Sequence, residues 1–200
     1  MKFLSAILLI IFVTSILALS LLSAALPMIS NVYYQYGAER AGVINTSLGL
    51  NAIDFLNDRA QLNSTAFTEK EKSHMADVKE FVLDLRWAWI QAFTIAAVSL
   101  AGIYAKSKKL AGKAIRYSAI AIIVTCVLFL IGNVFFSSTF DAFHRLFFKP
   151  GSYIFGEGEI LPKLFPISFF LDSFAIIVAS CFAAAVLALV TMKLIKERKK

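Results

Sequence analysis

The two histidines of this sequence are the side chains best suited to proton transfer near neutral pH. His74 lies in "KSHMADV" and His144 in "FDAFHRLFF". Each has an aspartate three residues away, Asp77 after His74 and Asp141 before His144. A carboxylate one helical turn from an imidazole can orient that imidazole as a general acid or base. The spacing therefore predicts an acid–base site built on the two histidines, with both aspartates as supporting residues.

Other chemistries have weaker support in the sequence. It contains no HExxH, no GxSxG, no glycine-rich phosphate loop and no cysteine cluster. His74, His144 and Asp77 are side chains that suit zinc, but no local spacing supports such a site. Cys126 and Cys181 lie in apolar runs, where a thiol is poorly activated, and are interpreted as packing residues. We expect neither a metal nor a cofactor.

The sequence contains four long apolar runs without charged residues, and the helices that they predict must position His74 and His144. The sequence is 59% hydrophobic and only 16% charged, far from the average of soluble proteins. Each run reaches the roughly 20 residues that a helix needs to cross a hydrocarbon core about 30 Å thick. The first is too long for the apolar part of a cleaved signal peptide, so we expect a retained anchor. We predict an all-α integral membrane protein with one domain, residues 1–200, and spans at about 3–28, 87–105, 116–136 and 173–192.

The basic residues gather on one side of these spans. With the N-terminus inside, the inner segments hold 11 of the 20 basic residues and one of the 13 acids, which gives +10. The outer segments hold the other 9 basic residues and 12 acids, which gives −3. The positive-inside rule then predicts cytoplasmic N- and C-termini and outer segments at about 29–86 and 137–172. The net charge of +7 reflects topology and does not indicate a nucleic-acid partner.

Each outer segment carries one histidine. In the first, "TSLGLNAIDFLND" is an amphipathic and partly helical stretch, and Thr68 and Glu71 form a capping-box pattern that starts a helix running into the second span. The second segment is rich in phenylalanine, and its prolines and glycines prevent one continuous helix. A segment so aromatic is expected to lie in the interface of the outer leaflet. His144 would then sit near the ester groups of the lipids.

Three stretches carry a resemblance to a known family. "FTEKEKSHMADVKEF" and, further along, "FDAFHRLFFKPGSYIF" and "LFPISFFLD" resemble the lipoprotein intramolecular transacylase (Lit) family of Gram-positive bacteria. The resemblance covers essentially the whole chain, with its four spans and two outer segments. It implies a plasma-membrane acyltransferase whose substrate is a diacylated lipoprotein. The sn-2 acyl chain of the S-diacylglyceryl group would move to the α-amino group of the N-terminal cysteine, giving a lyso-form lipoprotein.

The resemblance also implies roles for particular residues. The family's functional histidines match His74 and His144, and the substrate and membrane lipids would be the partners. The residues with an implied supporting role are Asp77, Asp141, Arg145 and Tyr153, and those with an implied role in holding acyl chains are Phe143, Phe147 and Phe148. Two alternatives stay open from the residues alone: a non-enzymatic lipid- or lipoprotein-binding protein, and a metal-dependent membrane hydrolase.

Overall fold

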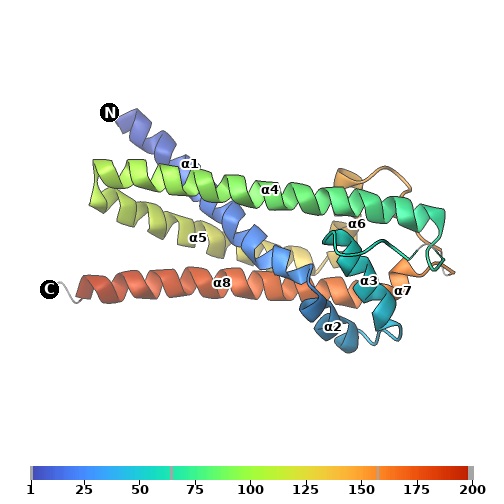
Figure 1. The fold of residues 1–200 in the computed structure, drawn as a ribbon. Helices are drawn as coiled ribbons and strands as arrows, with labels where there is room; N and C mark the ends of the chain where they lie inside the picture. The colour runs from blue at the N-terminus through green and yellow to red at the C-terminus, as the bar shows by residue number, and fades with distance from the viewer. Residues whose placement is uncertain (1, 64, 157, 198–200) are drawn as a thin grey trace. The chain divides into compact units, whose positions relative to one another are not determined.

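The computed structural model describes residues 2–63, 65–156 and 158–197, and within these ranges the regular structure is helical, without strands. A 3-10 turn at Leu26–Met28 separates the first two helices (Figure 1). The helices are α1 (Lys2–Ala25), α2 (Asn31–Arg40), α3 (Thr46–Leu56), α4 (Glu69–Lys106), α5 (Lys108–Asn133), α6 (Phe136–Phe147), α7 (Leu161–Leu164) and α8 (Ile167–Glu197).

Four of the helices in the described ranges are long and apolar enough to cross a membrane, which confirms the predicted all-α architecture with four spans. They are α1, α4, α5 and α8. The third differs in its bounds from the predicted 116–136, since α5 begins at Lys108 and ends at Asn133. It begins early because Ser107 caps it, with the Leu110 N–H donating to the Ser107 hydroxyl at 3.3 Å.

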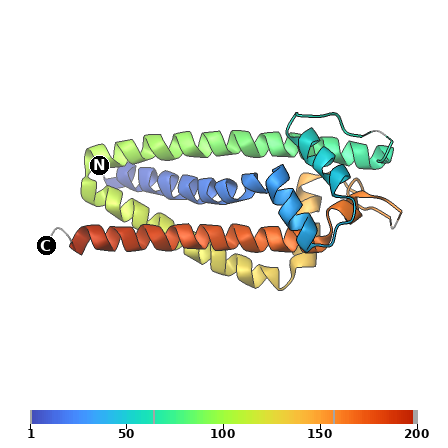
Figure 2. The same ribbon diagram turned by 60° about the horizontal axis from the view of Figure 1, so that its bottom comes forward.

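The chain divides into two compact units. Unit 1 comprises the residues up to Ala24, Trp87–Ile131, and the residues from Ile177 on. Phe12 and Ile103 pack there against small alanine side chains, which lets helix backbones approach closely. Within this unit the start of α1, the α4–α5 connection and the end of α8 lie at the same end in both views (Figures 1 and 2).

Unit 2 comprises Ala25–Arg86 and Gly132–Ile176. Its core joins α2, α3, the start of α4, α7 and the start of α8. Tyr34 is fully buried, and its hydroxyl donates to the Leu164 carbonyl at 3.1 Å. Gly49 allows this packing because a Cβ there would overlap the Tyr34 hydroxyl. Unit 2 therefore has a core of its own.

Helix α4 is longer than a span requires. Its 38 residues extend about 57 Å, roughly twice the thickness of a hydrocarbon core. Its charge-free part is 87–105, whereas the part from Glu69 to Arg86 carries charged side chains throughout and belongs to unit 2. We take 87–105 as the spanning segment, so His74 lies in the part of α4 that extends beyond it.

The aromatic segment after the third span is more regular than expected. Residues Phe136 to Phe147 form helix α6, where the sequence predicted an interfacial loop. The helix ends at Phe147, the next residue, Phe148, is extended, and Gly151 follows with a φ of 82° that disfavours other residues. His144 consequently occupies the last turn of a helix.

Candidate active site

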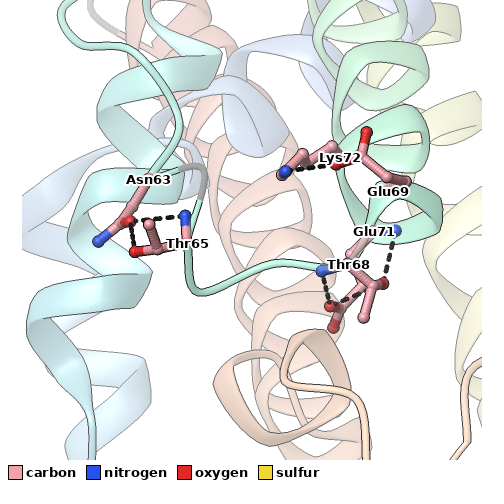
Figure 3. A network of polar contacts seen from close by, with 6 residues as sticks. All are labelled: Asn63, Thr65, Thr68, Glu69, Glu71 and Lys72. Atoms are coloured by element: carbon pink, nitrogen blue, oxygen red, sulfur yellow. Dashed lines mark hydrogen bonds and ion pairs between the residues drawn. The ribbon is translucent and has the colours of Figure 1, made fainter.

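The start of α4 sets the position of His74. The Thr68 N–H donates to Glu71 Oε2 at 2.8 Å, and the Glu71 N–H donates back to Thr68 Oγ1 at 3.3 Å (Figure 3). These two bonds confirm the predicted capping box. His74 follows Glu71 by three residues and is therefore on nearly the same face, one helical turn further on.

Glu71 also bonds to the second stretch of unit 2, Gly132–Ile176. Its Oε1 accepts the backbone N–H groups of Ile160 at 2.6 Å and Leu161 at 2.8 Å. Only 1% of this residue is exposed. Burial by itself would raise the pKa of the Glu71 carboxyl, but the bonds from Leu161, Thr68 and Ile160 outweigh it and lower the pKa. Glu71 is thus an ionised, fully bonded carboxylate inside the protein.

His144 is held by the backbone of its own helix. Its Nδ1 lies 2.7 Å from the Phe140 carbonyl oxygen. Because a carbonyl can only accept, Nδ1 carries the hydrogen and the neutral ring presents its lone pair at Nε2. The prediction that Asp141 orients this ring is wrong, since Asp141 pairs with Arg145 one turn further along α6. The Phe140 carbonyl thus orients the His144 ring, a role that the spacing had predicted for the Asp141 carboxylate.

The two imidazoles lie next to each other. Their ring centroids are 6.2 Å apart and their planes are inclined by 25°. His74 is only 7% exposed, and its buried Nδ1 has no hydrogen-bond partner among the described residues. Asp77 therefore does not orient His74 through Nδ1 and acts on it through charge alone. The structure thus brings the two predicted histidines together, whereas Asp77 influences His74 only through its charge.

Burial and charge determine the protonation of His74. Burial is the main cause that lowers its pKa from 6.5 to about 4, His144 lowers it further, and Asp77 opposes both. His74 is consequently neutral near neutral pH. A positive charge on His144 would further disfavour a charge on His74.

Aromatic rings cover both imidazoles. Phe148 is buried, with its ring 5.1 Å from that of His74 and 5.5 Å from that of His144. Tyr153 lies 5.1 Å from His144, and Phe155 lies 5.3 Å from His74. Phe155 was not predicted as a site residue. The only signal for it in the sequence is its place two residues after Tyr153 in the aromatic segment.

A second group of rings extends outward from this cover. Phe81 lies 4.8 Å from Phe147 and 5.6 Å from Phe143, and Phe148 joins the group to the histidines. Phe143 is 39% exposed and Phe147 is 49% exposed, so the group presents an apolar surface. Phe81 follows His74 by seven residues and so lies on the same face of α4, but nothing in the sequence predicts its contact with α6.

Comparison with known proteins identifies the chain. The sequence model of the lipoprotein intramolecular transacylase Lit matches residues 2–170. The chain belongs to the Lit family. Membership confirms the resemblance and the expectation of a membrane acyltransferase. An uncharacterized protein of Aquifex aeolicus is 25% identical to this Lit-family chain in a match of 154 aligned positions that covers 72% of this chain and 68% of that one.

Solved structures share the Lit fold. The membrane-integral lipoprotein intramolecular transacylase Lit from Bacillus cereus, solved in meso, matches with a TM-score of 0.84 and 14% identity over 100% of this chain and 99% of its own. Two structures of that protein with a single histidine replaced, one by arginine and one by alanine, match with TM-scores of 0.74 and 18% identity. They cover 99% of this chain and 94% and 96% of their own. These matches show that the fold is common to the family.

The site of this Lit-family chain offers proton transfer next to an apolar surface. His144 presents an oriented lone pair, and His74 presents a buried nitrogen with no partner. The described residues include no group of three or more His, Cys, Asp or Glu side chains that could hold a metal ion. The arrangement suits a reaction in which an amine loses a proton and an oxygen gains one.

Proposed function

We propose that this protein transfers the sn-2 acyl chain of an S-diacylglyceryl cysteine, in a bacterial lipoprotein, to the α-amino group of the same cysteine. The reaction breaks a C–O ester bond, forms a C–N amide bond and leaves a lyso-form lipoprotein. Family membership supports this activity. The observation that carries it is the pair of imidazoles 6.2 Å apart beside an exposed aromatic surface.

His144 activates the nucleophile in this proposal. An α-ammonium group has an ordinary pKa of about 8 and must lose a proton before its nitrogen can attack. His144 is half-buried, so a substrate can reach it, and its Nδ1–H bond to Phe140 aims the Nε2 lone pair. His144 Nε2 therefore accepts the ammonium proton and releases it to water. The free amine then attacks the ester carbonyl.

His74 completes the transfer. The attacking nitrogen must lose one more proton, and the departing sn-2 oxygen must gain one. His74 is neutral and can accept the proton from nitrogen. With a pKa of about 4, its protonated form is a strong acid that returns the proton to the oxygen. One proton thus moves from nitrogen to oxygen, and no water is consumed.

The substrate supplies much of the rate enhancement. The amine and the ester belong to one molecule, so the protein mainly has to fold that molecule until the reacting atoms meet. Well-oriented intramolecular reactions gain on the order of 7–11 kcal/mol in this way. A covalent acyl-enzyme is unnecessary, which agrees with a site built on imidazoles.

The aromatic group around Phe81 holds an acyl chain in this proposal. Replacing Phe143 and Phe147 together with serine should raise the KM for a diacylated lipopeptide about fivefold for each ring lost, since each contact contributes about 1 kcal/mol. Phe148→Ser should instead lower kcat, because this ring covers the two imidazoles. The measurement is steady-state kinetics in lipid nanodiscs.

A matched control for these variants is Ile44→Ser. Ile44 is fully exposed in unit 2 and lies outside the aromatic group, so its replacement should leave both constants unchanged. An unchanged KM in the Phe143→Ser, Phe147→Ser double variant would mean that these rings contact only bulk lipid.

The catalytic face is proposed to be the outer face of the plasma membrane. The end of α4, the start of α5 and the end of α8 carry basic residues and lie together in unit 1 (Figures 1 and 2). Reporter fusions after Lys109 and Lys200 should therefore report a cytoplasmic location, and fusions at Asn63 and Gly156 an external one. A cytoplasmic signal at Gly156 would remove His144 from the outer face and contradict the proposal.

The experiment that tests the activity compares lipoproteins from cells with and without this protein. Because the acyl chain moves within one molecule, the intact mass stays constant, and fragmentation must locate the chain on the cysteine nitrogen. Cells with the protein should yield N-acyl, S-monoacylglyceryl peptides. A mass loss of one acyl chain that a chelator prevents would indicate a metal-dependent hydrolase. Unchanged lipopeptides would indicate a binding protein.

A further inference from the structure

The residues between α6 and α7 that the structure describes, 148–156 and 158–160, are called segment 148–160 and supply the rings that cover the imidazoles. Phe148 and Phe155 lie on His74, and Tyr153 lies on His144. The end of this segment is bound to the first turn of α4, where the Glu71 carboxylate accepts the N–H groups of Ile160, the last residue of the segment, and of Leu161, the first residue of α7. A buried carboxylate with such bonds is a stronger anchor than an exposed one, since water does not compete for the donors.

We propose that Glu71 is a positioning residue that holds segment 148–160 over the two histidines. The inference rests on the proposed function as far as its effect on catalysis is concerned. Glu71 does not touch the reacting groups. It ties the segment that bears Tyr153 and Phe155 to the helix that bears His74, one turn away from that histidine.

Further contacts from the same helical turn support this role. The Lys70 ammonium donates to the Ile154 carbonyl and lies 5.4 Å from the centre of the Phe155 ring. Glu159, within the segment, accepts the Gly156 N–H at 2.6 Å. The Lys70 and Glu159 bonds are exposed and therefore weaker, whereas the Glu71 bonds are buried. Glu71 is thus the main connection between the segment and α4.

The two oxygens of Glu71 separate its two tasks. Oε2 accepts from Thr68 and caps α4, while Oε1 accepts from Ile160 and Leu161 and holds the segment (Figure 3 shows the Thr68 bonds). Glu71→Gln keeps one carbonyl oxygen, but its amide nitrogen accepts no N–H bond, so one of the tasks fails. Thr68→Val removes the capping hydroxyl, and with it the exposed 3.3 Å bond to Glu159, and leaves Oε1 with both of its buried donors. The pair of variants separates the anchor from the cap.

The pKa of His74 shows whether the rings of segment 148–160 still bury this imidazole, because burial is the main cause of its lowered pKa. With only two histidines in the chain, labelled imidazoles give two NMR signals in nanodiscs, and His144→Gln assigns them. The groups that act on His74 electrostatically are His144 from α6 and Asp77 from α4, and Lys70 and Glu159 lie further out around the segment. Loss of the Glu71 charge alone would lower the pKa of His74, whereas hydration of an uncovered ring would raise it. The direction of the change therefore distinguishes the two causes.

Glu71→Gln should raise the pKa of His74 from about 4 toward its ordinary 6.5, by about one unit or more. It should also lower kcat about tenfold or more with a smaller change in KM. Thr68→Val should leave the pKa of His74 near the wild-type value. Glu71→Asp keeps the charge but is too short to bind both amides, so it should raise the pKa as well and serves if Glu71→Gln does not fold.

An unchanged or lower pKa of His74 in both Glu71→Gln and Glu71→Asp, or in the one of them that folds, would overturn the positioning role, as would an equal rise in Thr68→Val. The titration requires no substrate. If wild-type protein forms no lyso-form product, the proposed function fails, and the titration still decides the role of Glu71.

Discussion

Replacing His144 with glutamine should abolish the formation of lyso-form lipoprotein. Glutamine can still donate a hydrogen bond to the Phe140 carbonyl, but it cannot take up a proton near neutral pH. General acid–base catalysis contributes typically about 10²–10⁴-fold, so the loss should be almost complete. The measurement is the yield of N-acylated lipopeptide per amount of inserted protein.

The matched control for His144→Gln is the double variant Cys126→Ala, Cys181→Ala. Both thiols are buried in unit 1 and lie near backbone carbonyls, at 3.6 Å from Val178 and 3.5 Å from Ser20. Neither has a part in the proposed chemistry, so this variant should stay active. Substantial activity of His144→Gln at normal expression would show that the histidine only anchors α6.

His74→Gln should cause a loss of similar size. In the proposed sequence His74 carries the proton from the attacking nitrogen to the departing oxygen, and glutamine cannot carry it. Expression and insertion should be normal, because the four spans determine insertion. Product yield in nanodiscs checks this prediction. Activity within a few fold of wild type would assign both proton transfers to His144.

The acid stability of His74→Gln provides an independent check on the burial of the ring. The pKa of His74 is about 4 in the folded protein and about 6.5 when unfolded, so the unfolded chain binds the proton more tightly. The stabilisation from a neutral His74 is complete above about pH 6.5 and is lost as the pH falls toward 4. Wild type should lose about 2 kcal/mol from this residue between about pH 7 and about pH 5. Thermal unfolding at both pH values should show a smaller loss for His74→Gln than for wild type, and an equal loss would contradict the burial.

The helices of this protein were predictable because a bilayer leaves the backbone few choices. A charge-free run in hydrocarbon must bond its own N–H and C=O groups, which a helix does. The start of α4 was also predictable, since Thr68 and Glu71 recognise each other within one turn. The bounds of α5 were less certain, because Ser107 starts that helix outside the apolar run.

The partners of the histidines were harder to predict, for physical reasons. Spacing brings Asp141 within one turn of His144, but it brings Arg145 equally close to Asp141, and the opposite charges pair. The imidazole then bonds to the Phe140 carbonyl, which every helix offers at that spacing. Sequence spacing describes neighbours on one helix and does not rank the bonds among them.

Contacts between distant segments had no local signal at all. Glu71 bonds to the Ile160 N–H, 89 residues later in the chain. The capping pattern predicted the bond that Glu71 Oε2 accepts from Thr68, but not the bonds that Oε1 accepts from Ile160 and Leu161. The stacking of His74 on His144 likewise depends on how α4 and α6 pack in unit 2. The sequence was enough to predict the two histidines as a pair, from their residue type and the predicted topology. It was not enough to predict that aromatic rings bury His74 and lower its pKa.

The central claim, that the acyl chain moves within one lipoprotein molecule, can be tested by a crossover measurement with purified protein in lipid nanodiscs. Two synthetic S-diacylglyceryl lipopeptides of different sequence are mixed in equal amounts, one of them with deuterated acyl chains, and fragmentation identifies the chain on each cysteine nitrogen. Every N-acylated product should carry its own peptide's chain, and His144→Gln should form no product. Products that carry the other peptide's chain, or released fatty acid in place of N-acylated peptide, would contradict the central claim.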